Sequence, residues 1–282
     1  MKKKNQIFTY FWLFPGVGYI IFFLSITIVM MVLQSFGFFS LTAASQFSFK
    51  YWQYLFDRQF LDCFLFSLKI GLVSTFGALI FSYPLALLMR KSFIWKKTFG
   101  SILKIPLFVP AVVGAFLIIN LMAYHGILNE VLLKLGLIKE PLRMLYNKWG
   151  INIIVIQIWK NIPFQLLIIS SVVETIRTDI EEAARNLGAN SFAVVRYIMF
   201  PLSIPGILAA VIIVFIFAFG DYVITKVAGP TYPTTLSVQM QTISMMFMEW
   251  NKAACIGVII MVTSALSAAF FAKLAKIIQG IK

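Results

Sequence analysis

Long apolar stretches alternate with short polar segments along this chain of 282 residues. Six of the stretches are long enough to cross the hydrocarbon core of a bilayer, which takes about 20 residues of helix. The pattern therefore predicts an all-α membrane protein, with six transmembrane helices in one membrane domain over residues 1–282. We place the spans at residues 8–34, 62–89, 103–123, 151–174, 204–225 and 253–274.

The most charged interruption of this pattern lies between the fourth and fifth spans, at residues 178–201. It predicts a hairpin of two short helices. Thr178 or Asp179 would cap the first helix, which begins near Ile180 and carries carboxylates in its first turn, where the helix dipole favours negative charge. Gly188 would end this helix in a left-handed conformation.

The second helix of the hairpin is predicted from residue 191 to about Met199. Asn190 and Ser191 are residue types that cap helices, because their side chains accept backbone N–H groups. Pro201 and Pro205 would then stop the second helix and start the fifth span.

The composition supports a membrane protein. Hydrophobic residues make up 61% of the chain and charged residues 12%, about half the charged share of a soluble domain. A net charge of +14 would suggest nucleic-acid binding in a soluble protein, but here the basic residues cluster at the ends of apolar runs, so we expect no nucleic acid. Cys63 and Cys255 lie far apart in or beside apolar segments and predict neither a disulfide nor a metal site.

The loop charges predict the orientation of the chain. The segments that would share one side hold 14 of the 24 basic residues, and the opposite segments hold eight. Because basic residues collect on the cytoplasmic side, both termini and the 178–201 hairpin are expected in the cytoplasm. The basic-rich segments are 1–7, 90–104, 175–202 and 273–282, and the opposite ones are 36–61, 124–150 and 226–252.

The hairpin carries a spaced motif: Glu-Ala-Ala, three residues, Gly, nine residues, Ile, one residue, an apolar residue and Pro. The residues that fill it are Glu182, Ala183, Ala184, Gly188, Ile198, Phe200 and Pro201. This spacing resembles the signature loop of bacterial binding-protein-dependent ABC importer permeases. Phe200 stands where Leu is usual in that family.

The resemblance extends along most of the chain. The segment 83–87 resembles the family's Gly/Tyr-Pro-x-Ala segment. The segments 126–129, 135–137, 145–146, 220–223 and 253–254 resemble the polyamine-type branch, which includes spermidine, putrescine and aminoalkylphosphonate permeases. The third span departs from polyamine permeases, because it lacks their basic and aromatic cluster. The resemblance leaves the solute open between a polyamine-like and an aminophosphonate-like compound.

The resemblance implies a type I ABC importer permease in the bacterial cytoplasmic membrane, with a coupling-helix hairpin on its cytoplasmic side. It implies three partners: a cytoplasmic ABC ATPase dimer, a second permease subunit, more often a distinct homologue in that branch, and an extracytoplasmic solute-binding protein. Such a chain is not an enzyme and holds no cofactor, because ATP and Mg bind to the ATPase. The chain indeed carries no Gly-x-x-x-x-Gly-Lys-Ser/Thr sequence.

Ionisable residues within spans are costly and are therefore candidates for the substrate path. Asp221 and Tyr222, near the outer end of the fifth span, would suit a cationic amine through charge pairing and cation–π contact. Alternatively, Asp221 caps the outer end of the fifth span or pairs with Lys226. Lys160, near Pro163 in the fourth span, would instead favour an anionic or zwitterionic solute.

A second class of protein fits the spans as well. A self-powered secondary transporter would need no ATPase, but usually has intramembrane charge relays and repeated halves. This chain has few intramembrane charges and one distinctive hairpin instead. The sequence therefore favours the membrane subunit of an ATP-driven importer for a small polar solute, working by alternating access.

Overall fold

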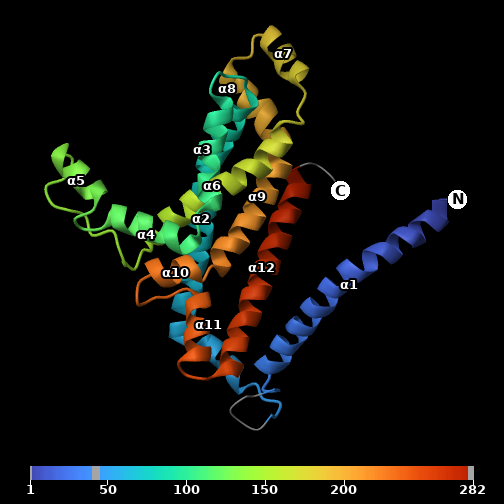
Figure 1. Ribbon diagram of the computed structural model, residues 1–282, viewed down its shortest axis with the longest axis vertical. Helices are drawn as coiled ribbons and strands as arrows, with labels where there is room; N and C mark the ends of the chain where they lie inside the picture. The colour runs from blue at the N-terminus through green and yellow to red at the C-terminus, as the bar shows by residue number, and fades with distance from the viewer. Residues whose placement is uncertain (1, 40–44, 279–282) are drawn as a thin grey trace. The chain divides into compact units, whose positions relative to one another are not determined.

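The computed structural model describes residues 2–39 and 45–278, and every regular element among them is helical. Six of the described helices are long and apolar enough to cross a membrane (Figure 1). Residues 279–282, which belong to the C-terminal segment expected in the cytoplasm, lie outside the described residues. The six candidate spans are Gly16–Ser35, Arg58–Arg90, Ala111–Lys134, Ile151–Val173, Ser191–Gly220 and Trp250–Ile278.

The chain divides into two compact units. One comprises Met1–Phe60 with Gln239–Met261, and the other comprises Leu61–Val238 with Val262–Lys282. Because α2 (Arg58–Arg90), α11 (Leu236–Met245) and α12 (Trp250–Ile278) run across the boundaries, each contributes to both units.

The first unit is built on α1 (Lys2–Ser35), whose most apolar window has none of its residues buried. Its C-terminal end is held by α12, where the Asn251 side-chain amide donates to the Gln34 carbonyl at 2.7 Å and Cys255 donates to the Ser35 carbonyl at 3.3 Å. The exposed apolar side chains of residues 17–30 match a surface whose solvent is lipid.

The second unit has α6 and α9 at its centre. The two helices pack closely at Gly206 of α9, where a Cβ would come within 2.7 Å of the Val172 side chain. Further apolar contacts join α2, α4 and α10 to α6. The helices of this unit after α2 are α3 (Lys96–Phe108), α4 (Ala111–Met122), α5 (Ile127–Lys134), α6 (Ile151–Val173), α7 (Thr178–Asn186), α8 (Ser191–Val194), α9 (Phe200–Gly220) and α10 (Val223–Ala228).

The third apolar stretch is broken, whereas the sequence pattern predicted one span over residues 103–123. Helix α3 ends before Val109, which is extended (φ −78°, ψ 123°), and α4 begins after Pro110. A proline disfavours helical conformation in the residue before it, and it offers no N–H to continue the helix. The apolar run is therefore two helices with a polar backbone at their junction.

The fifth span also begins differently from the prediction. The second helix of the hairpin is not stopped by Pro201; instead α8 passes through a π turn, Val195–Met199, directly into α9. The N–H of Phe200 reaches back to the carbonyl of Val195. Pro201 has no N–H to donate to the carbonyl of residue 197, and the wider turn accommodates its ring. The second helix of the hairpin and the fifth span therefore form one continuous helix.

Candidate functional site

The polar hairpin between α6 and α9 has well-defined ends. Gly188 follows α7 with φ +88°, and its N–H donates to the Arg185 carbonyl at 2.9 Å while the Ala189 N–H donates to the Ala184 carbonyl at 3.0 Å. These two bonds form a Schellman motif, which requires a left-handed residue. Asn190 accepts the Ala193 N–H at 2.8 Å and caps α8. The structure confirms the predicted left-handed helix end at Gly188 and the predicted helix cap at Asn190.

The start of α7 differs from the prediction. The helix begins at Thr178, with no side-chain bond at its N-cap. The Asp179 carboxylate pairs with Arg177, two residues before it, and also accepts the Ile180 N–H at 3.1 Å. The first turn of α7 thus carries a local, exposed ion pair, and no side chain bonds to the helix from its N-cap residue.

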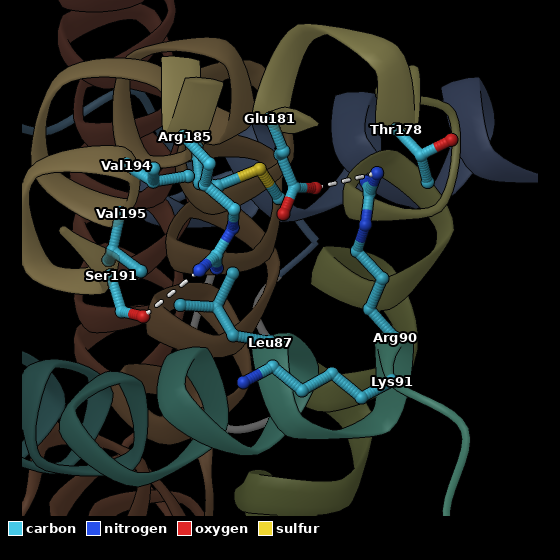
Figure 2. A pocket seen from close by; sticks show the side chains of 10 residues that line it. Leu87, Arg90, Lys91, Thr178, Glu181, Arg185, Ser191, Val194 and Val195 are labelled. Atoms are coloured by element: carbon cyan, nitrogen blue, oxygen red, sulfur yellow. Dashed lines mark hydrogen bonds and ion pairs between the residues drawn. The ribbon is translucent and has the colours of Figure 1, made fainter. Parts of the chain in front are cut away.

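One side of the hairpin faces the end of α2. The guanidinium of Arg90, the last residue of α2, lies 2.8 Å from the Glu181 carboxylate of α7. The same guanidinium donates to the carbonyls of Val173 and Ile176, the latter at 2.6 Å, at the C-terminal end of α6. Figure 2 shows Arg90 and Glu181 pointing toward each other across the gap between the two helices. Arg90 therefore contacts two helices besides its own.

A pocket of about 220 Å³ separates the hairpin from the end of α2. Three cations line it, Arg90, Lys91 and Arg185, with Glu181 as the carboxylate among its lining residues. Arg185 donates to the Ser191 hydroxyl at 3.3 Å and so joins α7 to α8 (Figure 2). The remaining lining residues are Leu87, Thr178, Ser191, Val194, Val195 and Met199.

The other side of the hairpin is exposed and partly apolar. Leu187 is 89% exposed, Phe192 70% and Tyr197 71%. Glu182 and Ala183 of the motif are exposed as well, whereas Ala184 is half-buried and packs against the core around α6 and α9. Exposed aromatic and aliphatic side chains are typical of a surface that another protein covers.

The second half of the motif lies where the hairpin joins α9. Ile198 is half-buried in the π turn, and Phe200 and Pro201 are exposed at the start of α9. The Phe200 ring meets the Tyr83 ring of α2 edge to face at 5.7 Å, and the Tyr83 hydroxyl accepts the Ser203 hydroxyl at 3.3 Å. Phe200 thus packs the start of α9 against α2. This contact gives a structural role to the phenylalanine that stands where the family usually has leucine.

The substrate-path candidates have separate partners. The Asp221 carboxylate accepts the N–H groups of Ile224 at 2.9 Å and Thr225 at 3.1 Å, so it caps α10. The cap lies on α10, the helix after the fifth span, whereas the sequence alternatives were a cap on the outer end of the fifth span itself or a pair with Lys226. Tyr222 is half-buried next to it.

Lys160 binds backbone carbonyls at the break between α3 and α4. Its ammonium donates to the carbonyls of Pro106, at 2.6 Å, and Val109, both at the end of α3. These carbonyls have no intrahelical donor because the helix ends there. A single lysine on α6 thereby satisfies the interrupted backbone of the third apolar stretch.

Sequence reasoning missed two features of this unit. Arg90 stood out only as one of many basic residues, because its partners lie more than 80 positions away. The second feature is a buried polar row on α6, Gln157, Asn161 and Gln165, in which Gln165 bonds to Ser82 and to a carbonyl of α2. The spacing of four residues puts the row on one helix face and was a readable signal.

The described residues contain no group of three or more His, Cys, Asp or Glu side chains that could hold a metal ion. Long apolar helices, with buried polar contacts between them and one polar hairpin at the end of a unit, define a multi-pass membrane protein. Residues 78–279 match the family described as binding-protein-dependent transport system inner membrane component. The chain belongs to this family: it is the permease component of an ABC importer in the inner membrane, and in this family the ATPase is a separate subunit.

The curated relatives include polyamine permeases. The spermidine/putrescine transport system permease protein PotB of Escherichia coli (strain K12) is 28% identical over 176 residues, covering 62% of this chain and 63% of that protein. The chain thus spans just under two thirds of the length of these relatives. The inner membrane ABC transporter permease protein YdcU of Escherichia coli (strain K12) is 24% identical, covering 80% of each chain.

Solved structures share the fold. A bacterial ABC transporter involved in the import of the acidic polysaccharide alginate matches with a TM-score of 0.77 at 20% identity, covering 97% of this chain and 96% of that one. The MetNI methionine ABC transporter in an inward-facing conformation matches with a TM-score of 0.61 at 16% identity, covering 78% and 96%. The all-helical fold is therefore structurally like that of type I ABC importer permeases.

Proposed function

We propose that this chain is the membrane-spanning subunit of an ATP-driven importer that moves a small polar solute, polyamine-like or aminophosphonate-like, into the cytoplasm by alternating access. Its 178–201 hairpin docks on a cytoplasmic ABC ATPase dimer. A second permease subunit, a distinct homologue, completes the path, and an extracytoplasmic solute-binding protein delivers the solute. Both termini lie in the cytoplasm.

The observation that carries this proposal is the exposed side of the hairpin. Leu187 and Phe192 are largely exposed although they are apolar, and the charged Glu182 of the same hairpin is exposed as well. Such a surface gains stability when another protein covers it, because buried apolar area contributes about 25 cal/mol per Å². Positive φ at Gly188 and the Asn190 cap present this surface in one conformation.

The coupling role is tested with Glu182→Lys, which reverses the charge on the exposed side. Tagged wild-type and variant chains are purified from native membranes in mild detergent, and co-purifying proteins are identified by mass spectrometry. We expect the wild type to retain an ATPase with a phosphate-binding loop and a second permease, and the variant to lose the ATPase while staying inserted. Glu140→Lys, an exposed carboxylate in the 124–150 loop, is the matched control and should keep every partner.

A well-inserted Glu182→Lys chain that keeps its ATPase and its uptake would contradict the docking role of the hairpin. A wild-type chain that purifies alone and still transports would instead identify a self-powered transporter.

We propose Asp221, Tyr222 and Lys160 as residues of the solute path, with Asp221 as the charge that selects a cation. Because the Asp221 carboxylate also caps α10, Asp221→Asn keeps an acceptor oxygen for the cap and removes the charge, whereas Asp221→Ala removes both. Uptake of spermidine and of 2-aminoethylphosphonate is measured in cells that carry each variant. Lower spermidine uptake in Asp221→Asn, with the ATPase retained, supports the charge role, and unchanged uptake refutes it.

A further inference from the structure

Helix α7 is loosely attached to its unit. None of its residues is buried, and the pocket of about 220 Å³ lies between it and the end of α2. Ala184 provides a limited apolar contact. Of the three ion pairs in the described part of the chain, the pair between Arg90 and Glu181 is the one that joins the hairpin to another helix. The position of α7 therefore depends strongly on this pair.

Arg90 is well suited to hold three elements together. Its planar guanidinium has five N–H donors in a fixed fork, so it can donate to two carbonyls while its charge pairs with the Glu181 carboxylate. The carbonyls of Val173 and Ile176 lie at the end of α6, where unpaired acceptors and the helix dipole favour a cation. Its side chain is only 12% exposed and that of Glu181 21%, so water screens the pair weakly.

We propose that Arg90 is a positioning residue that makes α7 move as one body with the ends of α2 and α6. A push on the hairpin then reaches α2 and α6 directly, in addition to α9, which continues from the hairpin through the π turn. Without Arg90, α7 would swing on the 174–177 link and deliver its motion to α9 alone. This inference rests on the proposed coupling function, and it names the residue that transmits the motion.

The experiment measures the distance between two spin labels. Labels are placed at Asn186→Cys in α7 and Thr98→Cys in α3, both exposed positions, and α3 packs against α6. The native Cys63 and Cys255 are buried, which directs the labels to the introduced thiols. Distance distributions are recorded on the full chain with its co-purified partners, first without nucleotide and then after trapping with ATP and vanadate.

We expect one distance population in the wild type, the same with and without nucleotide. Arg90→Gln removes the ion pair and weakens the bonds to α6, and Glu181→Gln removes the ion pair alone, with little risk to folding because Glu181 is partly exposed. Both variants should show a second population of detached hairpin. The ratio of detached to attached hairpin rises about tenfold for each 1.4 kcal/mol by which the variant weakens the attachment of α7.

Arg177→Gln is the matched control, because it removes an ion pair of the same hairpin that is local and exposed (77% for Arg177 and 56% for Asp179). It should keep the wild-type distribution. A single wild-type population in both Arg90→Gln and Glu181→Gln would overturn the proposal, as would a wild-type distance that changes on nucleotide trapping. If no ATPase co-purifies with the wild type, the proposed function fails, and the distances without nucleotide still decide whether Arg90 holds the hairpin.

Discussion

Replacing Gly188 by alanine isolates the contribution of hairpin geometry to ATPase docking. The backbone at Gly188 has φ +88°, and a Cβ there would meet no atom within 4 Å. The substitution therefore causes no clash, and its whole cost is that of a left-handed L-residue, about 1–2 kcal/mol. A free hairpin can relieve this strain by rearranging, whereas a docked hairpin cannot. Docking should therefore weaken by about 5- to 30-fold.

Gly136 provides a matched control. It follows α5 with φ +68°, a Cβ there would also meet nothing within 4 Å, and it carries the same pair of hydrogen bonds, from Gly136 to Leu133 and from Leu137 to Leu132. Gly136→Ala introduces the same backbone strain outside the hairpin. It should lower the stability of the chain by a similar amount and leave ATPase docking unchanged.

The assay titrates the purified ATPase onto immobilised permease and compares Kd values for wild type, Gly188→Ala, Gly188→Asn and Gly136→Ala. Gly188→Asn should bind almost as well as wild type, because asparagine adopts the left-handed conformation more readily than alanine. The reasoning is refuted if Gly188→Ala binds like Gly136→Ala, since the conformation at residue 188 would then not control docking.

Two further predictions concern the membrane helices. Lys160→Met should lower stability by about 1–3 kcal/mol, because the carbonyls of Pro106 and Val109 lose their donor, and a detergent thermal unfolding curve that matches wild type would contradict that role for Lys160. Gly206→Ala should lower stability by about 1–3 kcal/mol, because its Cβ would approach Val172 side-chain atoms to 2.7 Å. Gly220→Ala in the same helix, where a Cβ meets nothing within 4 Å, is the control and should unfold near the wild-type temperature.

The sequence predicted the parts of this fold that local physics determines. Apolar runs mark membrane helices because lipid accepts only apolar side chains over that length. Gly188 and Asn190 were predictable because helix ends need particular residue types. The hairpin motif also identified the family correctly.

The rest depends on contacts between distant residues. The sequence gives no sign that Arg90 meets Glu181, because a partner 91 positions away is found only when the helices pack. The same holds for Lys160, whose acceptors on α3 lie more than 50 positions before it in the sequence. Pro110 is a residue type that interrupts helices, so the sequence did offer a signal for the break. The apolar residues on both sides of Pro110 made the segment look like one continuous span.

Glu181 and Glu182 are adjacent carboxylates with different surroundings, one held by Arg90 and the other exposed. A substitution at residue 182 can therefore change what the hairpin recognises without altering how the hairpin is fastened to its own helices. The two tasks can evolve separately. A permease of this kind could change its ATPase through the exposed side alone and keep its internal mechanics, which makes exchange of partners between related transport systems accessible in few mutational steps.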